Sequence, residues 1–203
     1  TETFSAAVQM SPGNGDGYVP LATALLQQGS REAALDQLKR AVEVDPGNLS
    51  AATALATLEL GSGRAVEAEA TYRRLIAALP LMPDGYVGLG DVYERRGQWE
   101  EAEAIYQEAL RTVSPALSGK VTLALADLRS RRGDFDRALA GYQDAIRQQP
   151  GLLDGYIALS QFHLRRGDFE AARGVLTEGL RIAAGAADLN RAMGNLESAA
   201  GDV

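Results

Sequence analysis

The chain has 203 residues, 46% of them hydrophobic, and a net charge of −7. This acidic balance argues against nucleic acid as a partner, because no basic stripe is available to displace counterions from phosphates. The absence of cysteine excludes disulfides and thiolate metal sites. No apolar run reaches the roughly 20 residues of a membrane helix. We therefore expect a soluble chain that is not embedded in a membrane, from either the cytoplasm or a bacterial periplasm.

Glycine and alanine recur at a fixed interval along the chain. The glycines are Gly29, Gly63, Gly97, Gly133, Gly167 and Gly201, spaced by 34 residues except for 36 between Gly97 and Gly133. An alanine stands five residues after each of the first five glycines. A period of 34 residues indicates paired helices that stack in a solenoid.

In chain order, this period predicts five full repeats with a partial repeat at each end. We expect the second helix of a partial repeat over residues 1–14, full repeats over 15–48, 49–82, 83–118, 119–152 and 153–186, and the first helix of another partial repeat over 187–203. The repeat 83–118 contains a two-residue insertion. We interpret the chain as a single solenoid cut from a longer array, whose uncovered terminal half-repeats favour end-to-end self-association.

Each repeat is predicted to hold two short helices. In the first helix a large residue precedes a small one, as in Leu89-Gly90, which allows close helix packing. The recurring glycine is expected to end this helix in the left-handed conformation. The residues directly after three of the glycines, Ser30, Asp134 and Asp168, are expected to cap the second helix.

The recurring positions resemble the tetratricopeptide repeat (TPR). The repeat that begins at Pro83 carries the family pattern most fully, with Tyr86, Leu89, Gly90, Tyr93, Gly97, Ala102, Tyr106 and Ala109. This resemblance implies an all-α fold, a right-handed α-solenoid of stacked antiparallel helix pairs. It also implies that the first helices line a concave groove in which a protein or peptide partner binds.

Transferring the family's groove positions to this chain gives a candidate partner-binding site. Its residues are Thr23, Thr57, Val87, Asp91, Glu94, Leu123, Asp127, Ile157, Gln161 and Asn195. The acidic members favour a neutral or basic partner segment over an acidic one. The positions at which one branch of the family grips C-terminal carboxylates with cations hold none here.

The sequence contains no recognisable catalytic machinery. The single histidine, His163, stands where the family usually places a buried tyrosine, so we expect it to pack rather than react. We predict no enzyme activity, no cofactor and no metal. The leading hypothesis is a non-catalytic interaction scaffold; the alternatives are a recognition segment of a larger enzyme or of a secretion or polysaccharide-assembly protein, and a self-assembling structural TPR protein.

Overall fold

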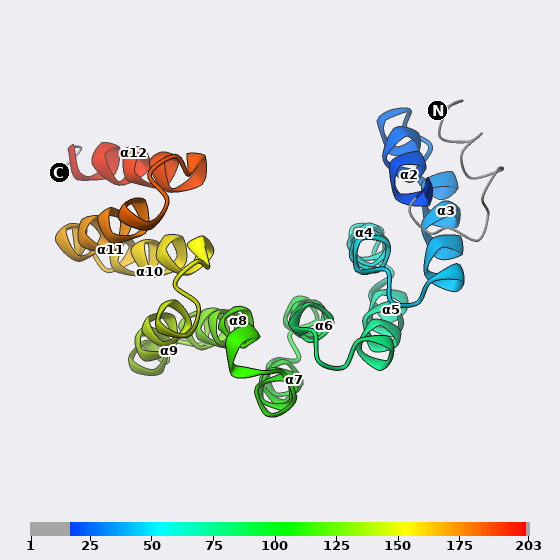
Figure 1. Cartoon of the computed structure of the whole chain (residues 1–203), viewed down its shortest axis with the longest axis horizontal. Helices are drawn as coiled ribbons and strands as arrows, with labels where there is room; N and C mark the ends of the chain where they lie inside the picture. The colour runs from blue at the N-terminus through cyan, green and yellow to red at the C-terminus, as the bar shows by residue number, and fades with distance from the viewer. Residues whose placement is uncertain (1–16, 202–203) are drawn as a thin grey trace. The chain divides into compact units, whose positions relative to one another are not determined.

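The computed structural model describes residues 17–201, and all regular secondary structure in that range is helical. Two compact units divide between Ile105 and Tyr106, inside one helix, and each is described by itself (Figure 1). The helix expected over residues 1–14 lies outside the described residues. Among residues 17–201, no helix is long and apolar enough to cross a bilayer.

The first unit is a stack of helices joined by short turns. It contains α2 (Tyr18–Gln27), α3 (Arg31–Val44), α4 (Leu49–Leu60), α5 (Ala65–Ala78), α6 (Pro83–Arg95) and the first part of α7 (Trp99–Thr112). From α2 to α6, each helix contacts the next one, and α4 also contacts α2 and α6. Turns this short reverse the chain, so successive helices run antiparallel.

The second unit repeats this arrangement. It contains the rest of α7, the 3₁₀ helix η2 (Pro115–Leu117), α8 (Gly119–Arg131), α9 (Phe135–Gln148), α10 (Leu153–Arg165), α11 (Phe169–Ile182) and α12 (Ala187–Gly201). Helix α10 contacts α8, α9, α11 and α12. The all-α repeat fold expected of a solenoid is therefore confirmed. The extra two residues of the third repeat fall where η2 forms.

The recurring glycines end the first helices as predicted. The first five of them, from Gly29 to Gly167, have positive φ, between 71° and 82°. At Gly133, where φ is 82°, the following N–H of Asp134 donates to the carbonyl of Arg129 over 3.0 Å. This hydrogen bond across the helix end closes α8 and turns the chain directly into α9.

Two of the three expected caps form. The carboxylates of Asp134 and Asp168 accept hydrogen bonds from the backbone N–H of Arg137 at 3.4 Å and of Ala171 at 3.1 Å. Ser30 occupies the same position before α3, but its hydroxyl makes no bond to the helix. The expected cap at Ser30 is therefore wrong.

The core of the first unit is built from aliphatic side chains and one very close helix contact. Its large side chains that are less than 2% exposed are Leu35, Leu38, Leu75, Leu89 and Val92. Helices α5 and α6 meet at Gly88, where a Cβ atom would lie 2.2 Å from the ring of Tyr72. The tyrosine ring therefore occupies the space that any larger residue at 88 would need.

The first unit also buries one acidic group. Glu59 is 2% exposed, and its carboxylate accepts a hydrogen bond from the hydroxyl of Thr71 at 3.0 Å. Burial raises the pKa of Glu59, while the hydrogen bond from Thr71 opposes that rise. The pair supplies polar contact between α4 and α5 within a mainly apolar interface.

In the second unit, two apolar clusters follow one another along the stack. The first joins α8, α9 and α10 through Ala126, Ala138, Tyr142, Leu159 and Phe162. The second joins α10, α11 and α12 through Tyr156, Ala172, Leu176, Leu189 and Leu196. Because α10 contributes to both clusters, the surface of this helix is fixed in position from both sides.

Gly174 provides a test of helix propensity inside this fold. It is exposed in α11, and no atom lies within 4 Å of the place that a Cβ would occupy. We expect Gly174→Ala to raise the free energy of unfolding by about 0.5–1 kcal/mol, because alanine loses less backbone entropy in a helix. Urea denaturation measures the change. Gly133→Ala is the matched control: its Cβ also meets open space, but the positive φ should make it destabilising by about 1 kcal/mol.

Candidate partner-binding surface

In the first unit, two of the expected groove residues are engaged by neighbouring side chains. The exposed Thr57 on α4 is a hydrogen-bond partner of Tyr72, which follows it by 15 residues on α5. On α6, the carboxylate of Asp91 pairs with the guanidinium of Arg95, with Oδ2 and Nε 2.8 Å apart. The charge of Asp91 is therefore partly compensated by an arginine of its own helix.

The other three expected residues of the first unit differ in accessibility. Thr23 is exposed, and its hydroxyl donates to the carbonyl of Val19 at 3.0 Å. Val87 is half-buried. Glu94 is only 6% exposed and follows a buried pair of residues in the last turn of α6. This burial corrects the expectation that Glu94 faces a partner.

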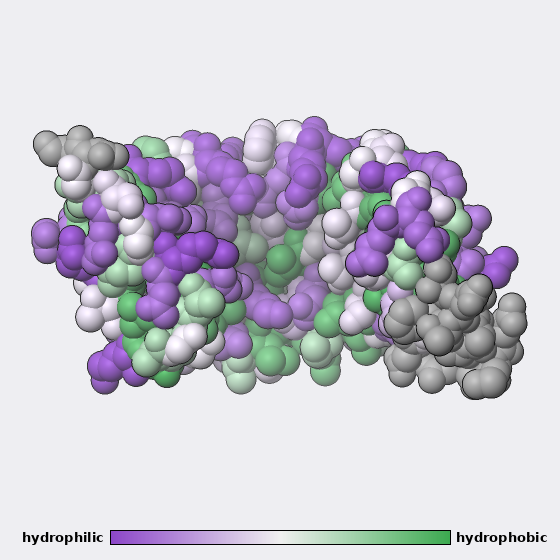
Figure 2. All heavy atoms as spheres, turned by 90° about the horizontal axis from the view of Figure 1, so that it is seen from above, coloured by the Kyte–Doolittle hydropathy of each residue, from purple (hydrophilic) through white to green (hydrophobic). Residues whose placement is uncertain are grey.

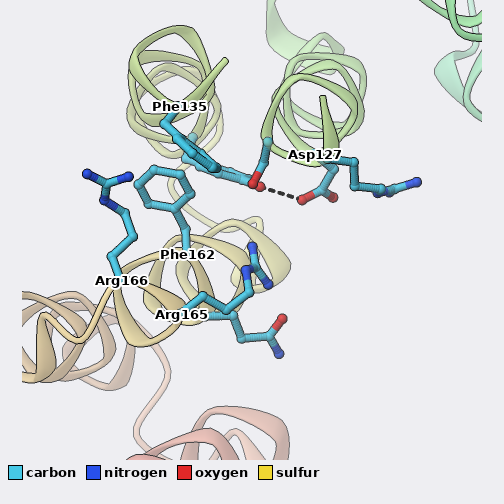
Figure 3. Close-up of a pocket in the computed structure, with 9 residues that line it drawn as sticks. Asp127, Phe135, Phe162, Arg165 and Arg166 are labelled. Atoms are coloured by element: carbon cyan, nitrogen blue, oxygen red, sulfur yellow. Dashed lines mark hydrogen bonds between the residues drawn. The ribbon is translucent and has the colours of Figure 1, made fainter. Parts of the chain in front are cut away.

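In the second unit, a cavity of about 620 Å³ opens between the ends of α8 and α10 and the start of α9. Its lining consists of Asp127, Ser130, Arg131, Phe135, Tyr142, Gln161, Phe162, Arg165 and Arg166 (Figure 3). We call this space the arginine cavity. Two of the expected groove residues, Asp127 and Gln161, lie in its wall.

A second cavity, of about 240 Å³, lies between α10 and α12. We call it the α10–α12 cavity; its lining includes the expected residues Ile157, Gln161 and Asn195. Gln161 is therefore common to both cavities, which lie on either side of it along the stack. Leu123, the fifth expected residue of this unit, instead packs against the apolar cluster of α8, α9 and α10.

Asp127 does not present a free carboxylate to the arginine cavity. The hydroxyl of Tyr142, which follows it by 15 residues, donates to its Oδ1 at 2.7 Å, drawn as the dashed line in Figure 3. Burial raises the pKa of Asp127, and the Tyr142 hydrogen bond together with the positive charges of Arg131 and Arg165 opposes that rise. Burial and the same hydrogen bond raise the pKa of Tyr142 strongly. The pair links α8 to α9.

Aromatic and cationic groups form the opposite wall. The guanidinium carbon of Arg166 lies 5.2 Å from the ring centroid of Phe135 and 5.7 Å from that of Phe162. These distances fit cation–π contacts. In Figure 3, Arg166 and Arg165 lie on opposite sides of Phe162, and Arg165 extends toward Asp127. The cavity thus combines aromatic surface with guanidinium groups.

Three models of the tetratricopeptide repeat match the chain, over residues 19–83, 82–150 and 130–200. The matches overlap or adjoin and together cover residues 19–200. The chain belongs to the tetratricopeptide repeat family. A search of curated proteins finds no matching sequence.

Solved TPR structures agree with this fold. TTC0263, a thermophilic TPR protein of Thermus thermophilus, is 24% identical with a TM-score of 0.67, and the match covers 91% of this chain and 98% of that one. Yeast Tom70 is 18% identical with a TM-score of 0.72, covering 98% of this chain and 42% of Tom70. YrrB, described as a TPR protein with an unusual peptide-binding site, is 19% identical with a TM-score of 0.50, covering 93% and 96%. At these identities the likeness concerns the fold.

His163 of this TPR chain packs as expected. Its ring stands edge-on to Phe162, with centroids 5.8 Å apart, and its Nδ1 lies 3.7 Å from a carboxylate oxygen of Asp168. In the described part of the chain, no group of three or more histidine, cysteine or acidic residues is placed to hold a metal ion.

The sequence did not single out the arginines and phenylalanines of the arginine cavity as functional. Arginines before a turn glycine are favoured by the dipole of the helix that they end, so the pairs do not by themselves indicate a binding site. The sequence does contain one signal for this cavity, a phenylalanine and an arginine pair at neighbouring turns. Phe135 follows one Arg-Arg-Gly turn, and Arg165-Arg166 precedes the glycine of the next. In a TPR stack, neighbouring turns of this kind lie side by side.

Proposed function

We propose that this TPR protein is a non-catalytic scaffold that binds a peptide segment of a partner protein, and that the second unit binds it across α10. The observation that carries the proposal is the pair of cavities that share Gln161. Four of the five groove residues expected in this unit, Asp127, Ile157, Gln161 and Asn195, line one cavity or both. An extended segment that crosses Gln161 would place side chains in each.

The sizes of the two cavities fit different parts of such a segment. The arginine cavity, of about 620 Å³, falls in the range of about 300–1,000 Å³ that is usual for ligand sites. The α10–α12 cavity, of about 240 Å³, is smaller and suits one side chain. Polar and apolar residues are interspersed over the face shown in Figure 2, a composition that protein interfaces share with the rest of a protein surface.

The expected preference for a neutral or basic partner rested on three carboxylates, and their surroundings no longer favour it. Asp91 is paired with an arginine on its own helix, and Glu94 is buried. Asp127 accepts a hydrogen bond from Tyr142. The negative charge that these groups offer to a basic segment is therefore smaller than the sequence suggests.

A cysteine scan tests where a peptide binds, and the chain is suited to it because it contains no cysteine of its own. A random peptide library displayed on phage is first selected against the full chain. We then expect a selected peptide to slow alkylation of the thiol in the Gln161→Cys variant several-fold, because a bound segment covers this position in both cavities. Mass spectrometry measures the alkylation rate.

The matched control is Glu178→Cys, an exposed position on α11 that lines neither cavity. Its alkylation should be the same with and without peptide. Equal protection of both thiols, or protection of neither, would contradict binding across α10. Failure to select any peptide would contradict the peptide-binding function itself.

A further inference from the structure

The arginine cavity concentrates positive charge within an acidic chain. Its lining contains three arginines, Arg131, Arg165 and Arg166, against one carboxylate, that of Asp127, whereas the whole chain carries a net charge of −7. Asp127 already accepts a hydrogen bond from Tyr142. The formal charge of the lining is therefore positive, and the one acidic group is partly satisfied from within the fold.

The α10–α12 cavity gives an internal comparison. It is also lined by an arginine, Arg191, but this guanidinium pairs with Asp188, three residues earlier and in the same lining. Its charge is compensated before any partner binds. In contrast, Arg165 in the arginine cavity is exposed, and the carboxylate on which its charge acts, that of Asp127, already accepts the hydrogen bond of Tyr142.

Arg166 is held in a position that suits recognition of an anion. Its guanidinium lies over the rings of Phe135 and Phe162, at 5.2 and 5.7 Å from their centroids. Stacking uses the face of the guanidinium and leaves its N–H groups, which lie in the plane, able to donate to an oxyanion. The stacked arginine also loses little side-chain entropy on binding, because packing already restrains it.

The aromatic wall of the cavity remains partly open to a ligand. Phe135 is 45% exposed, while Phe162 beneath it is 3% exposed. An exposed phenylalanine beside the Arg166 guanidinium offers an apolar surface next to an anion site. The two features lie within one cavity and would recognise adjacent groups of the same ligand (Figure 3).

We propose that the arginine cavity binds acidic side chains of the partner peptide, glutamate or aspartate carboxylates that pair with Arg165 on one side of Phe162 or with Arg166 on the other, with a neighbouring apolar side chain on Phe135. This proposal rests on the proposed peptide-binding function and names the chemistry of its ligand. A carboxylate matches the paired N–H geometry of a guanidinium, and charge-assisted bonds of this kind are about twice as strong as neutral ones.

The peptides selected from the phage library provide the probe. We expect them to be enriched in acidic residues adjacent to an aromatic or aliphatic one. The tightest is then synthesised in its selected form and with glutamine or asparagine replacing its acidic residues. Calorimetry should show that the neutral peptide binds about tenfold more weakly, and that Arg165→Gln weakens the acidic peptide by a similar factor. The double substitution Arg165→Gln and Arg166→Gln should weaken it further.

Arg181→Gln is the control variant, because Arg181 is exposed in the last turn of α11 and lines neither cavity. It removes the same charge and should leave the affinity unchanged. Circular dichroism checks folding; Arg165→Gln removes an exposed side chain, so it should not unfold the protein.

Other outcomes separate this proposal from the broader function. Selected peptides that are neutral or basic, and that still protect the Gln161→Cys thiol, would overturn the acidic ligand and leave the peptide-binding function standing. Acidic peptides whose affinity falls equally in Arg165→Gln and Arg181→Gln would overturn the assignment to this cavity, because attraction would then be general. If no peptide is selected, both proposals fail.

Discussion

Replacing Gly88 by alanine is expected to lower the free energy of unfolding by about 3 kcal/mol, at the upper end of the usual cost of overpacking. The added Cβ would lie 2.2 Å from Cε1 and 2.3 Å from Cζ of Tyr72, much closer than atoms in contact can approach. Tyr72 is 6% exposed, so its ring has little room to move aside. Urea denaturation followed by circular dichroism measures the loss.

A double variant identifies the cause of this loss. Tyr72→Leu removes the ring atoms that the new Cβ would meet, so Gly88→Ala should cost much less in that background than in the original chain. Additive effects of the two substitutions would show that the clash is absent. A Gly88→Ala variant as stable as the original chain, or more stable in the way of an ordinary helical Gly→Ala change, would also contradict the close contact between α5 and α6.

The Tyr142→Phe variant is expected to be destabilised by about 1.5–3 kcal/mol near neutral pH. The ring would keep its fully buried position, but Asp127 would lose the hydroxyl that donates to it at 2.7 Å. A hydrogen bond to a charged group is worth about this much, and a half-buried carboxylate without its donor is costly. Thermal and urea denaturation measure the difference.

The sign of the pH dependence follows from the pKa of Asp127, which burial raises in the folded protein above the ordinary aspartate value. At a pH between the pKa of Asp127 in the unfolded chain and its higher pKa in the folded protein, the folded state binds more protons. The contribution of Asp127 to the free energy of unfolding therefore falls as the pH rises through this range. Removing the hydrogen bond raises the folded pKa of Asp127 further. Tyr142→Phe should therefore cost more at about pH 7 than at about pH 4, near the unfolded value. An equal cost at both would contradict the role of the charged carboxylate.

The sequence was sufficient to predict the repeat and its turns because these depend on local chemistry. Glycine at a position that requires positive φ, as at Gly133, leaves a mark at every repeat. Aspartate directly after the glycine caps the next helix at Asp134 and Asp168, since the donor and acceptor are only three residues apart. Such contacts hardly depend on how the helices pack.

The chemistry of the candidate site was harder to predict because it depends on contacts between helices. Asp127 was expected to be an open acidic group, but its hydrogen bond comes from Tyr142 on the next helix. The arginine cavity requires the turn before Phe135 and the end of α10 at Arg165 to meet, although they are 30 residues apart in the chain. Position in a repeat predicts which face a side chain occupies, and it does not say which neighbour compensates its charge.

The hydrogen bonds of Tyr72 with Thr57 and of Tyr142 with Asp127 join the same two repeat positions, 15 residues apart, in the two units. The earlier residue of each pair, Thr57 or Asp127, is one of the expected groove residues. A substitution there changes what the surface offers and, in the same step, how firmly two helices of the repeat are held together. Variation in specificity at this position is therefore coupled to stability, and we expect a change there to be tolerated most readily when the tyrosine changes with it.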